Sequence, residues 1–513
     1  MVAPTVLNVG RHHWRFALAA MLLAIAPAAA RASDWTFPVE YSKDVHTGPF
    51  SGRVCILFSK MRREPRTGPG WFKPELFVSR DVENWMPGET ITFTSRQPDG
   101  MLAHPVPLEK MKLAGYRAQA VARFNPHVRN VGTGAGNGYS QVVRVESSSA
   151  GASAPTLVID QLVEPKQFSE TKWTKLLDIR SEKLSEFHGR DVELRAAVTL
   201  PASYYDQPER RYPVIFNVPG FGGTHFHGIA KQPVPERNAE GVEFLRVMLD
   251  PSCPRGHHVF ADSANNGPVG TAFIEEFLPA FDEAYRSVAA PTARFLTGHS
   301  SGGWSSLWLQ VTYPESFGGT WSTAPDPVDF RDFQLINLYR PDENMYVDAA
   351  GERRPLARRN GKVLLWYQDF AEMEWTLGYG GQLHSFEAAF SHRMPDGKPA
   401  LMWDRTTGRV DTDVARTWET YDIRLVLERN WKTLGPKLAG KLHVFMGDAD
   451  TFYLDGATKR LAASLRELGS DAVVEIHPGK DHGSLLDRPM RDRIRHEMVE
   501  AYLKHHTSAG DAR

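Results

Sequence analysis

The sequence predicts an α/β protein in which a doubly wound, mostly parallel sheet follows a small all-β sandwich domain. Strand-like and helix-like segments alternate from about residue 164 onward, as they do in parallel sheets with crossover helices. The region before it holds strand-like segments and turns, and little that looks helical. Within the alternating part, residues 298–302 (Gly-His-Ser-Ser-Gly) lie between a strand pattern and a helix pattern. We therefore expect two folded domains, at 33–163 and 164–513.

The composition is that of a large globular protein with little net charge. The chain has 513 residues, 42% of them hydrophobic, and can bury more than one core. Its net charge is −1 and no block of Lys and Arg stands out, so nucleic acid is not an expected partner. Cys55 and Cys253 are the only cysteines. We expect both to be free and buried, although export would permit a disulfide.

Residues 1–32 have the features of an export signal peptide. Two arginines, Arg11 and Arg15, precede an apolar run over residues 16–30. Residues 30–32 (Ala-Arg-Ala) form a small-residue cleavage site, so the mature chain would begin at Ser33. The apolar run is short for a membrane span. We therefore expect a periplasmic or secreted protein with no stable membrane insertion after cleavage; an uncleaved anchor is the alternative.

Residues 33–163 are expected to form the β-sandwich-like domain. Strand-like segments at 53–58, 91–94 and 141–145 are separated by turns rich in Gly, Pro and Asn. No group of residues in this part suggests catalysis. Its expected role is to pack against the larger domain or to present substrate to it.

Residues 164–513 are expected to form the larger domain. The strand-like segments lie at 175–179, 192–198, 212–218, 295–297, 441–446 and 472–476. Helices are expected at 271–288 and from Asp455, as the N-cap, to Gly469. Residues 326–440 form a long insertion rich in aromatic residues. This insertion would form a cap or one wall of a pocket; an ordinary packed excursion is the alternative.

Residues 298–302 match the G-x-S-x-G pattern of a nucleophile elbow. In that motif the central serine, here Ser300, occupies a sharp, strained turn that lifts its hydroxyl clear of the sheet edge. Gly298 and Gly302 would remove Cβ atoms that collide where strand and helix pass closely. The start of the helix also directs free N–H groups at the site. Ser300 is therefore the predicted nucleophile, and a purely structural turn is the alternative.

A serine nucleophile needs a histidine base that is held by an acid, and in this type of sheet the chain order is serine, acid, histidine. His482 lies in a compact loop after the last predicted strand, and Asp448 and Asp450 follow the strand before it. We predict His482 as the base. We predict Asp450 as the acid, because the chain must turn after Gly447 before a carboxylate can face His482. Asp448 is the alternative, and is expected instead to bond backbone N–H groups of its own turn.

The oxyanion of an acyl-transfer intermediate needs N–H donors. One predicted donor is the backbone N–H of Ser301, and the other is that of Phe221, in a glycine-rich loop that follows a buried strand. The glycines would let this loop approach the substrate carbonyl. We assign substrate contacts to Gly222, His225 and Trp304.

Other clusters carry weaker signals. Residues 225–227 (His-Phe-His) could suggest a metal site, but no Asp-His pair continues a binuclear pattern, so no metal is expected. No P-loop or dinucleotide glycine pattern is present, and no cofactor is expected. His257, His258 and residues 262–266 could line the pocket or cap the following helix, and both interpretations stay open.

Four stretches together resemble the Putative esterase group of α/β-hydrolases, which includes enterochelin esterases, feruloyl-esterase-type enzymes and esterase D. They are 212–216 (Tyr-Pro-Val-Ile-Phe), 220–223 (Gly-Phe-Gly-Gly), 294–303 (Arg-Phe-Leu-Thr-Gly-His-Ser-Ser-Gly-Gly) and 313–317 (Tyr-Pro-Glu-Ser-Phe). The resemblance spans approximately residues 175–500. It implies an α/β-hydrolase fold with Ser300 as nucleophile, His482 as base and an aspartate in the Gly447 loop. This chain departs from the smaller members of the group in two features, the insertion at 326–440 and the N-terminal domain.

The sequence therefore predicts an exported serine esterase that cleaves carboxylic esters through an acyl-enzyme intermediate, without a cofactor. The expected substrate is a small-molecule or glycan-linked ester. A prolyl-oligopeptidase-like peptidase shares the G-x-S-x-G-G pattern, but usually carries an N-terminal propeller larger than residues 33–163 can make. An acyltransferase on the same scaffold and a catalytically silent binding protein are the further alternatives.

Overall fold

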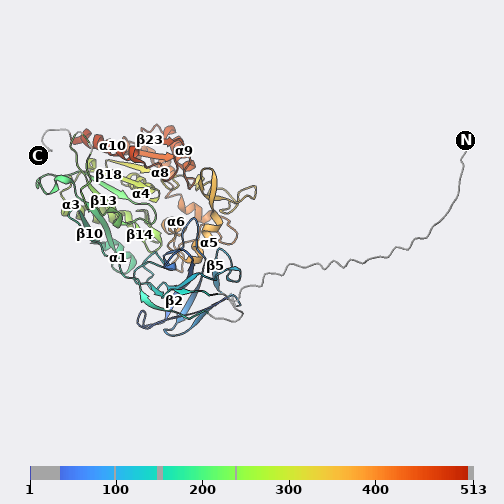
Figure 1. Ribbon diagram of the computed structural model, residues 1–513. Helices are drawn as coiled ribbons and strands as arrows, with labels where there is room; N and C mark the ends of the chain where they lie inside the picture. Colours follow the sequence, from blue (N-terminus) through green and yellow to red (C-terminus); the bar gives the residue numbers. More distant parts are fainter. Residues whose placement is uncertain (2–34, 97–99, 147–153, 237, 239, 507–513) are drawn as a thin grey trace, which may run out of the picture.

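The computed structural model describes residues 1, 35–96, 100–146, 154–236, 238 and 240–506. The predicted signal peptide, apart from Met1, and the predicted cleavage point before Ser33 lie outside these residues. Two large sheets organise the described chain, and Figure 1 shows them as an N-terminal domain (blue) below an α/β domain (green to red). No helix in the described part is long and apolar enough to cross a membrane.

The N-terminal domain is all-β, as predicted, but its strands form one sheet that wraps around its own core rather than two stacked sheets. The strand order is β4-β1-β9-β7-β6-β2-β3-β5, with β8 beside β6. The strands are β1 Thr36–Tyr41, β2 Phe50–Ser59, β3 Phe77–Trp85, β4 Ile91–Thr94, β5 Met101–His104, β6 Arg117–Ala122, β7 Gly138–Ser140, β8 Val143–Arg144 and β9 Leu157–Leu162. The predicted sandwich is corrected in this respect, because a strand pattern along the chain does not reveal which edges pair.

Alternate residues of β2 face two different cores. Val54, Ile56 and Phe58 pack inside the N-terminal domain. Cys55 and Leu57 point to the other face of the sheet, where they join a core built largely by the insertion. Because both faces of β2 are buried, the N-terminal domain is packed firmly against the rest of the protein.

The second sheet confirms the predicted doubly wound α/β-hydrolase fold. Its strand order is β10-β11-β13-β12-β18-β19-β22-β23. β11 is antiparallel to β10 and β13, and the pairs from β13 to β23 are parallel. The strands are β10 Thr174–Arg180, β11 Glu193–Thr199, β12 Val214–Val218, β13 Leu245–Leu249, β18 Arg294–His299, β19 Gly319–Thr323, β22 Leu442–Gly447 and β23 Val473–His477. The ends of β18, β22 and β23 therefore meet at one edge.

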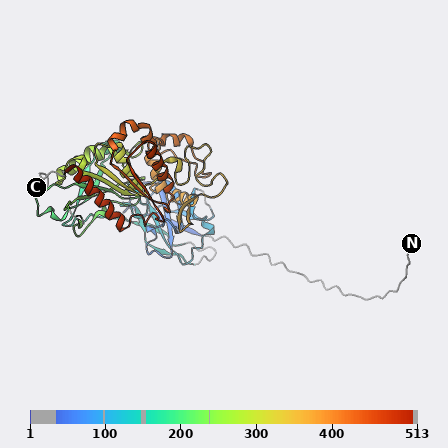
Figure 2. The ribbon, with the colours of Figure 1, turned by 90° about the horizontal axis from the view of Figure 1, so that it is seen from above.

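Helices cover both faces of this sheet. Met490 and Ile494 of α10 pack on one face against Phe295 and Trp321, and Figure 2 shows α10 (red) lying across the strands. The helices are α1 Glu182–His188, α2 Val269–Ala272, α3 Leu278–Ala284, α4 Ser301–Thr312, α5 Tyr367–Leu377, α6 Gln382–Phe390, α7 Thr412–Trp418, α8 Ile423–Leu438, α9 Asp455–Glu467 and α10 Arg488–His506. Short strand pairs are β14 Ser252–Cys253 with β15 Gly256–His257, β16 Asp262–Ser263 with β17 Gly267–Pro268, and β20 Pro355–Arg359 with β21 Lys362–Trp366.

Three elements differ in detail from their predictions. The helix expected at 271–288 consists of α2, a π-helical turn at Phe273–Phe277 and α3, and it ends at Ala284 because Tyr285 is extended. Leu454 is the N-cap of α9, and Asp455 is its first helical residue. The segment expected at 141–145 shrinks to the two-residue strand β8.

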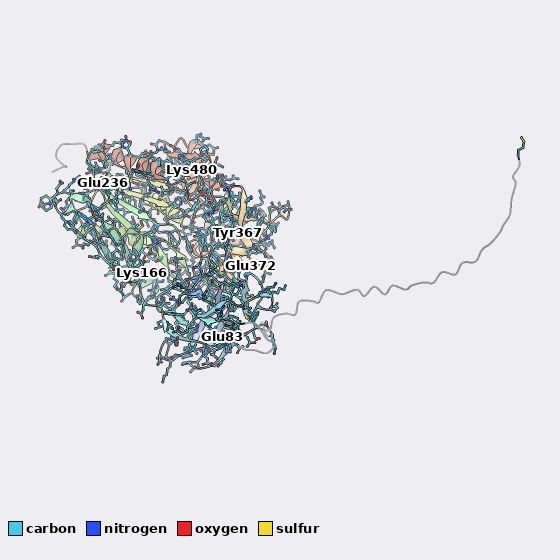
Figure 3. All side chains as sticks on the ribbon, in the orientation of Figure 1. Glu83, Lys166, Glu236, Tyr367, Glu372 and Lys480 are labelled. Carbon is cyan, nitrogen blue, oxygen red and sulfur yellow. The ribbon has the colours of Figure 1, made fainter. Side chains whose placement is uncertain are left out.

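The insertion lies between the N-terminal domain and the second sheet. Figure 1 shows α5 and α6 beside β5, and Figure 3 shows Tyr367 between Lys480 at the upper end of the molecule and Glu83 at the lower end. Arg53 of β2 and Ser79 of β3 both donate to the backbone carbonyl of Thr376, at 2.7 and 2.5 Å. These bonds join the N-terminal sheet to the end of α5.

Candidate active site

Ser300 occupies the sharp turn that the sequence predicts between β18 and α4. Its backbone angles, φ 60° and ψ −127°, are rare for a residue with a side chain. A Cβ atom on Gly298 would lie 2.1 Å from the carbonyl oxygen of Gly302, and one on Gly302 would lie 1.9 Å from that of Val218. Both positions therefore require glycine, and the crowding around them holds the strained turn in place.

Asp450 is the aspartate that contacts His482. The Nδ1 atom of His482 lies 2.7 Å from Oδ2 of Asp450, whose side chain is fully buried. The other oxygen of Asp450 accepts the backbone N–H groups of Phe452 at 2.8 Å and Leu454 at 3.3 Å. The exposed Asp448 instead accepts the backbone N–H of Gly479 at 2.7 Å, in the neighbouring loop. Asp450 is thus oriented toward the imidazole, and Asp448 is not.

The surroundings of His482 favour its protonated form. Burial lowers the pKa of this imidazole, but the hydrogen bond to Asp450 and the charges of Asp450 and Asp326 outweigh burial, and the pKa is raised above its ordinary 6.5. The ring of His299 lies 4.6 Å from that of His482. Burial and the charge of His482 lower the pKa of His299 to about 4. At neutral pH, His299 is uncharged and His482 can accept a proton and hold it.

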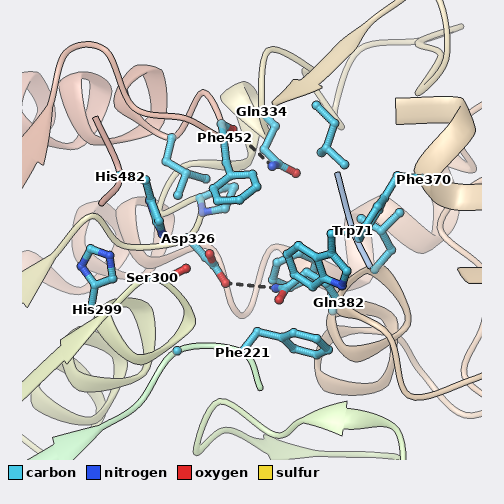
Figure 4. Close-up of a pocket in the computed structure, with 16 residues that line it drawn as sticks. Trp71, Phe221, His299, Ser300, Asp326, Gln334, Phe370, Gln382, Phe452 and His482 are labelled. Carbon is cyan, nitrogen blue, oxygen red and sulfur yellow. Dashed lines mark hydrogen bonds between the residues drawn. The ribbon is translucent and has the colours of Figure 1, made fainter. Parts of the chain in front are cut away.

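Ser300 and His482 line one end of a cavity of about 260 Å³ (Figure 4). The lining residues come from all parts of the chain: Trp71, Gly220, Phe221, His299, Ser300, Asp326, Pro327, Gln334, Leu356, Phe370, Gln382, Leu383, Phe386, Phe452, Leu454 and His482. The insertion supplies half of this list, and so forms one wall of the cavity, as expected. Trp71 and Phe370 lie at the end farther from Ser300, whereas Phe452 lies beside His482, with ring centroids 5.0 Å apart.

The N-terminal domain contributes Trp71 to the cavity. Its ring centroid lies 5.1 Å from that of Phe370 and 5.5 Å from that of Phe221. The loop that carries Trp71 is held by Glu75, which accepts the backbone N–H of Gly70 at 2.8 Å. The N-terminal domain therefore packs against the larger domain and contributes a side chain to the cavity wall.

Of the two predicted oxyanion donors, Phe221 lines the cavity and Ser301 directly follows Ser300 in the chain. Gly220 and Phe221 line the cavity beside Ser300. Ser301 is the first residue of α4, where a backbone N–H has no carbonyl of its own helix to bond. A Cβ atom on Gly220 would approach the Ser300 side chain to 3.3 Å, so this loop passes close to the serine.

Asp326 is a carboxyl group in the cavity that the sequence analysis did not single out. It is 6% exposed, and its Oδ2 accepts hydrogen bonds from Ser301 Oγ at 2.6 Å and Gln382 Nε2 at 3.4 Å. Burial raises its pKa to about 6. Its position just beyond the end of β19, the neighbour of β18, was the signal that could have found it.

The three residues assigned to substrate contacts do not line the cavity, and these assignments are corrected. Trp304 is 1% exposed and stacks on Trp308 in the core, with ring centroids 5.2 Å apart, because it lies on the packed side of α4. His225 is buried, with Nδ1 2.5 Å from Asp250. Gly222 lies next to Phe221 but faces Arg129.

The remaining polar clusters have structural partners. His227 pairs with Thr224 in a capping box, and the described residues contain no group of three or more His, Cys, Asp or Glu side chains that could hold a metal. Among the residues left open, Asp262 accepts the backbone N–H of Thr271 in α2 at 2.9 Å and so caps that helix. His257 and His258 bond the backbone of Pro219 and Phe260 instead, and neither lines the cavity. Cys55 and Cys253 are free, as expected; Cys55 is buried and Cys253 is half-buried.

Comparison with known proteins places this geometry in a family context. Residues 188–482 match the family described as Putative esterase. None of the curated proteins matches the chain. Among solved structures, a ferulic acid esterase aligns with 13% identity over 64% of this chain and 99% of its own, at a TM-score of 0.39. An S-formylglutathione hydrolase from Agrobacterium tumefaciens aligns with 15% identity over 64% of this chain and 95% of its own, at a TM-score of 0.38. The dipeptidyl peptidase 4 of Porphyromonas gingivalis aligns with 11% identity over 83% of this chain and 48% of its own, at a TM-score of 0.36. Scores this low carry no argument about activity.

Proposed function

The chain belongs to the Putative esterase family, and we propose that it is a serine hydrolase that cleaves carboxylic esters through an acyl-enzyme intermediate. The observation that carries this proposal is the buried contact between His482 and Asp450 at a cavity that Ser300 also lines. A serine on a strained turn, a histidine and a buried carboxylate are the groups that such chemistry needs.

Each residue has a defined role in the proposed reaction. Ser300 Oγ attacks the ester carbonyl while His482 takes its proton, and the N–H groups of Ser301 and Phe221 stabilise the oxyanion. His482 then gives the proton to the leaving alkoxide, so an alcohol departs and Ser300 stays acylated. Water, deprotonated by His482, then attacks the acyl group; the acyl–Ser300 bond breaks, His482 returns the proton to Ser300 Oγ, and the carboxylic acid departs. Asp450 fixes the imidazole tautomer and stabilises the imidazolium.

The substrate class and the location of the enzyme are parts of the same proposal. The apolar, aromatic lining and the volume of about 260 Å³ suit a small-molecule ester or the end of a glycan-linked one. The signal pattern of residues 1–32 supports export to the periplasm or the medium. Mass spectrometry of the exported protein tests this, since a mature N-terminus near Ser33 is expected and an intact Met1 in a membrane fraction would contradict it.

The decisive experiment combines labelling with turnover. A fluorophosphonate probe should modify Ser300, and Ser300→Ala should lose both labelling and hydrolysis of 4-nitrophenyl acetate, by about 10⁶-fold as in other triad knockouts. Ser306→Ala is the matched control, because Ser306 is a buried serine of α4, the helix that follows Ser300, and does not line the cavity. Turnover that persists in Ser300→Ala would refute the proposal. Peptide substrates and added acceptor alcohols distinguish an esterase from a peptidase or an acyltransferase.

A further inference from the structure

One wall of the cavity carries a buried hydrogen-bond acceptor without a partner. Gln334 is 6% exposed and lines the cavity. Its Nε2 donates to the carbonyl oxygen of Phe452 at 3.2 Å, whereas its Oε1 has no hydrogen-bond partner within the described part of the chain. Figure 4 shows the amide reaching into the opening. Buried polar atoms are almost always satisfied, so a donor inside the cavity would complete this group.

The backbone around Gln334 is strained, which shows that its position is strongly determined. Gln334 and Leu335 have φ values of 56° and 74°, in the left-handed region that residues with side chains disfavour. The turn is closed by two backbone bonds between Phe333 and Ile336, at 2.7 and 3.3 Å, and Asp332 accepts the N–H of Leu335 at 2.9 Å. Strain of this kind persists where the surroundings enforce it, and it clusters at ligand sites.

The other polar groups of the cavity do not suit an anion. Asp326 is a buried carboxyl group, and none of the lining residues in the described chain is Lys or Arg. A substrate carboxylate would be desolvated here beside another carboxylate, with neither Lys nor Arg to pair with it, and the charge of protonated His482 is already paired with Asp450. A neutral hydroxyl group, in contrast, can donate to Gln334 Oε1 without introducing charge.

We propose, on the basis of the esterase function above, that Gln334 is a specificity-determining residue. Its Oε1 accepts a hydrogen bond from a hydroxyl group of the ester substrate, and the cavity excludes esters that carry a carboxylate there. The hydroxyl can belong to the acyl part or to the alcohol part of the ester. A hydroxyl group in either part makes the same hydrogen bond, but the two parts lie on opposite sides of the ester bond that is cleaved.

Matched esters test each source by their kcat/KM values. The acyl series consists of the methyl esters of phenylacetic acid with a 4-hydroxy, 4-methoxy or 4-carboxy group. The alcohol series consists of the phenylacetate esters of ethylene glycol and of its monomethyl ether. In one of the two series, kcat/KM for the ester with a free hydroxyl should exceed kcat/KM for its methyl ether by about 10- to 100-fold. The reason is that the methyl ether leaves the buried acceptor Oε1 of Gln334 unpaired. The carboxy ester should be the slowest of its series.

Substitution of Gln334 links this preference to one atom. Gln334→Met keeps the length of the side chain without the acceptor, and should bring the hydroxyl-to-methoxy ratio close to 1. Gln310→Met is the control: Gln310 is a buried glutamine of α4 whose Oε1 also lacks a partner, but it does not line the cavity. This control should keep the wild-type ratio. Gln334→Glu, which retains an acceptor, should keep a hydroxyl preference.

The outcomes separate this inference from the proposed function. An unchanged ratio in folded Gln334→Met, or equal rates for hydroxyl and methoxy esters in both series with the wild type, would overturn the role of Gln334. If the thermal melt shows that Gln334→Met does not fold, Gln334→Glu decides. Loss of the hydroxyl preference in that variant overturns the role of Gln334, and retention of the preference supports it. Absence of ester hydrolysis, or turnover in Ser300→Ala, would contradict the esterase function itself.

Discussion

His257 donates a hydrogen bond from Nε2 to the carbonyl oxygen of Pro219, across 3.0 Å. Its Nδ1 accepts the backbone N–H of Val259 at 3.1 Å, so Nε2 carries the proton. Burial lowers the pKa of this imidazole to about 3, and it stays neutral at any pH near 7. The bond ties a rigid interior group to the loop whose next residues, Gly220 and Phe221, line the cavity. His257 is therefore a positioning residue for a predicted oxyanion donor.

Replacing His257 should lower kcat more than it raises KM. His257→Phe keeps the ring but releases Pro219, and we expect kcat to fall by about tenfold to a hundredfold, since complete loss of an oxyanion donor costs about 10²–10³. His257→Gln can still donate and should recover much of the rate. His258→Gln is the control, because His258 is equally buried but bonds the backbone of Phe260. Steady-state kinetics on one ester would settle the point; equal losses in kcat for His257→Phe and His258→Gln would argue against it.

The two aspartates after β22 should differ sharply in their effect on turnover. Asp450→Asn places an amide against Nδ1 of His482 and should reduce kcat by about 10⁴, because the imidazole loses its tautomer control. Asp448→Asn changes a group that accepts the backbone N–H of Gly479, and the rate should stay within about tenfold of wild type. Both variants are assayed beside the wild type with folding checked by thermal melt. The reverse ranking would show that Asp450 is not the acid.

Short sequence motifs were enough to predict the candidate site residues that lie at the ends of strands. Ser300, Asp450 and His482 each follow a strand of one parallel sheet, so their convergence follows from fold class alone. Trp71 and Gln334 could not be predicted in this way, because their positions depend on how the N-terminal domain and the insertion pack together. Trp304 was misassigned since helical spacing does not distinguish a core-facing side from a cavity-facing one.

Trp71 should influence large substrates more than small ones. Its ring lies at the end of the cavity farther from Ser300 and packs against the rings of Phe221, Phe370 and Phe452. Trp71→Ala removes that wall, and we expect KM for an aromatic ester to rise by about tenfold relative to KM for an acetate. Phe72→Ala is the control, because Phe72 is its exposed neighbour and does not line the cavity. A uniform change for both esters would mean that Trp71 acts on the fold rather than on substrate.

Asp326 should make the protein less stable at alkaline than at acidic pH, relative to an amide in its place. Its folded-state pKa of about 6 lies above the ordinary 3.8, so the folded protein binds this proton more tightly than the unfolded chain. The stability of the wild type therefore gains as pH falls through 6. Asp326→Asn lacks the charge, so at pH 8 its free energy of unfolding should be up to about 3 kcal/mol higher than that of the wild type. Urea denaturation at pH 8 and pH 4.5 measures this difference, which should shrink at the lower pH.

The same substitution should shift the pH dependence of turnover. The charge of Asp326 helps to raise the pKa of His482, and the base works only when that imidazole is neutral. The acid limb of kcat/KM should therefore lie above pH 6.5 in the wild type and move to lower pH in Asp326→Asn. Ser301 Oγ and Gln382 Nε2 can still donate to the amide oxygen, so the cavity keeps its shape. Because the limb and the stability difference depend on one charge, they must change together. A limb that stays in place while stability changes would mean that Asp326 lies too weakly coupled to His482 to tune it.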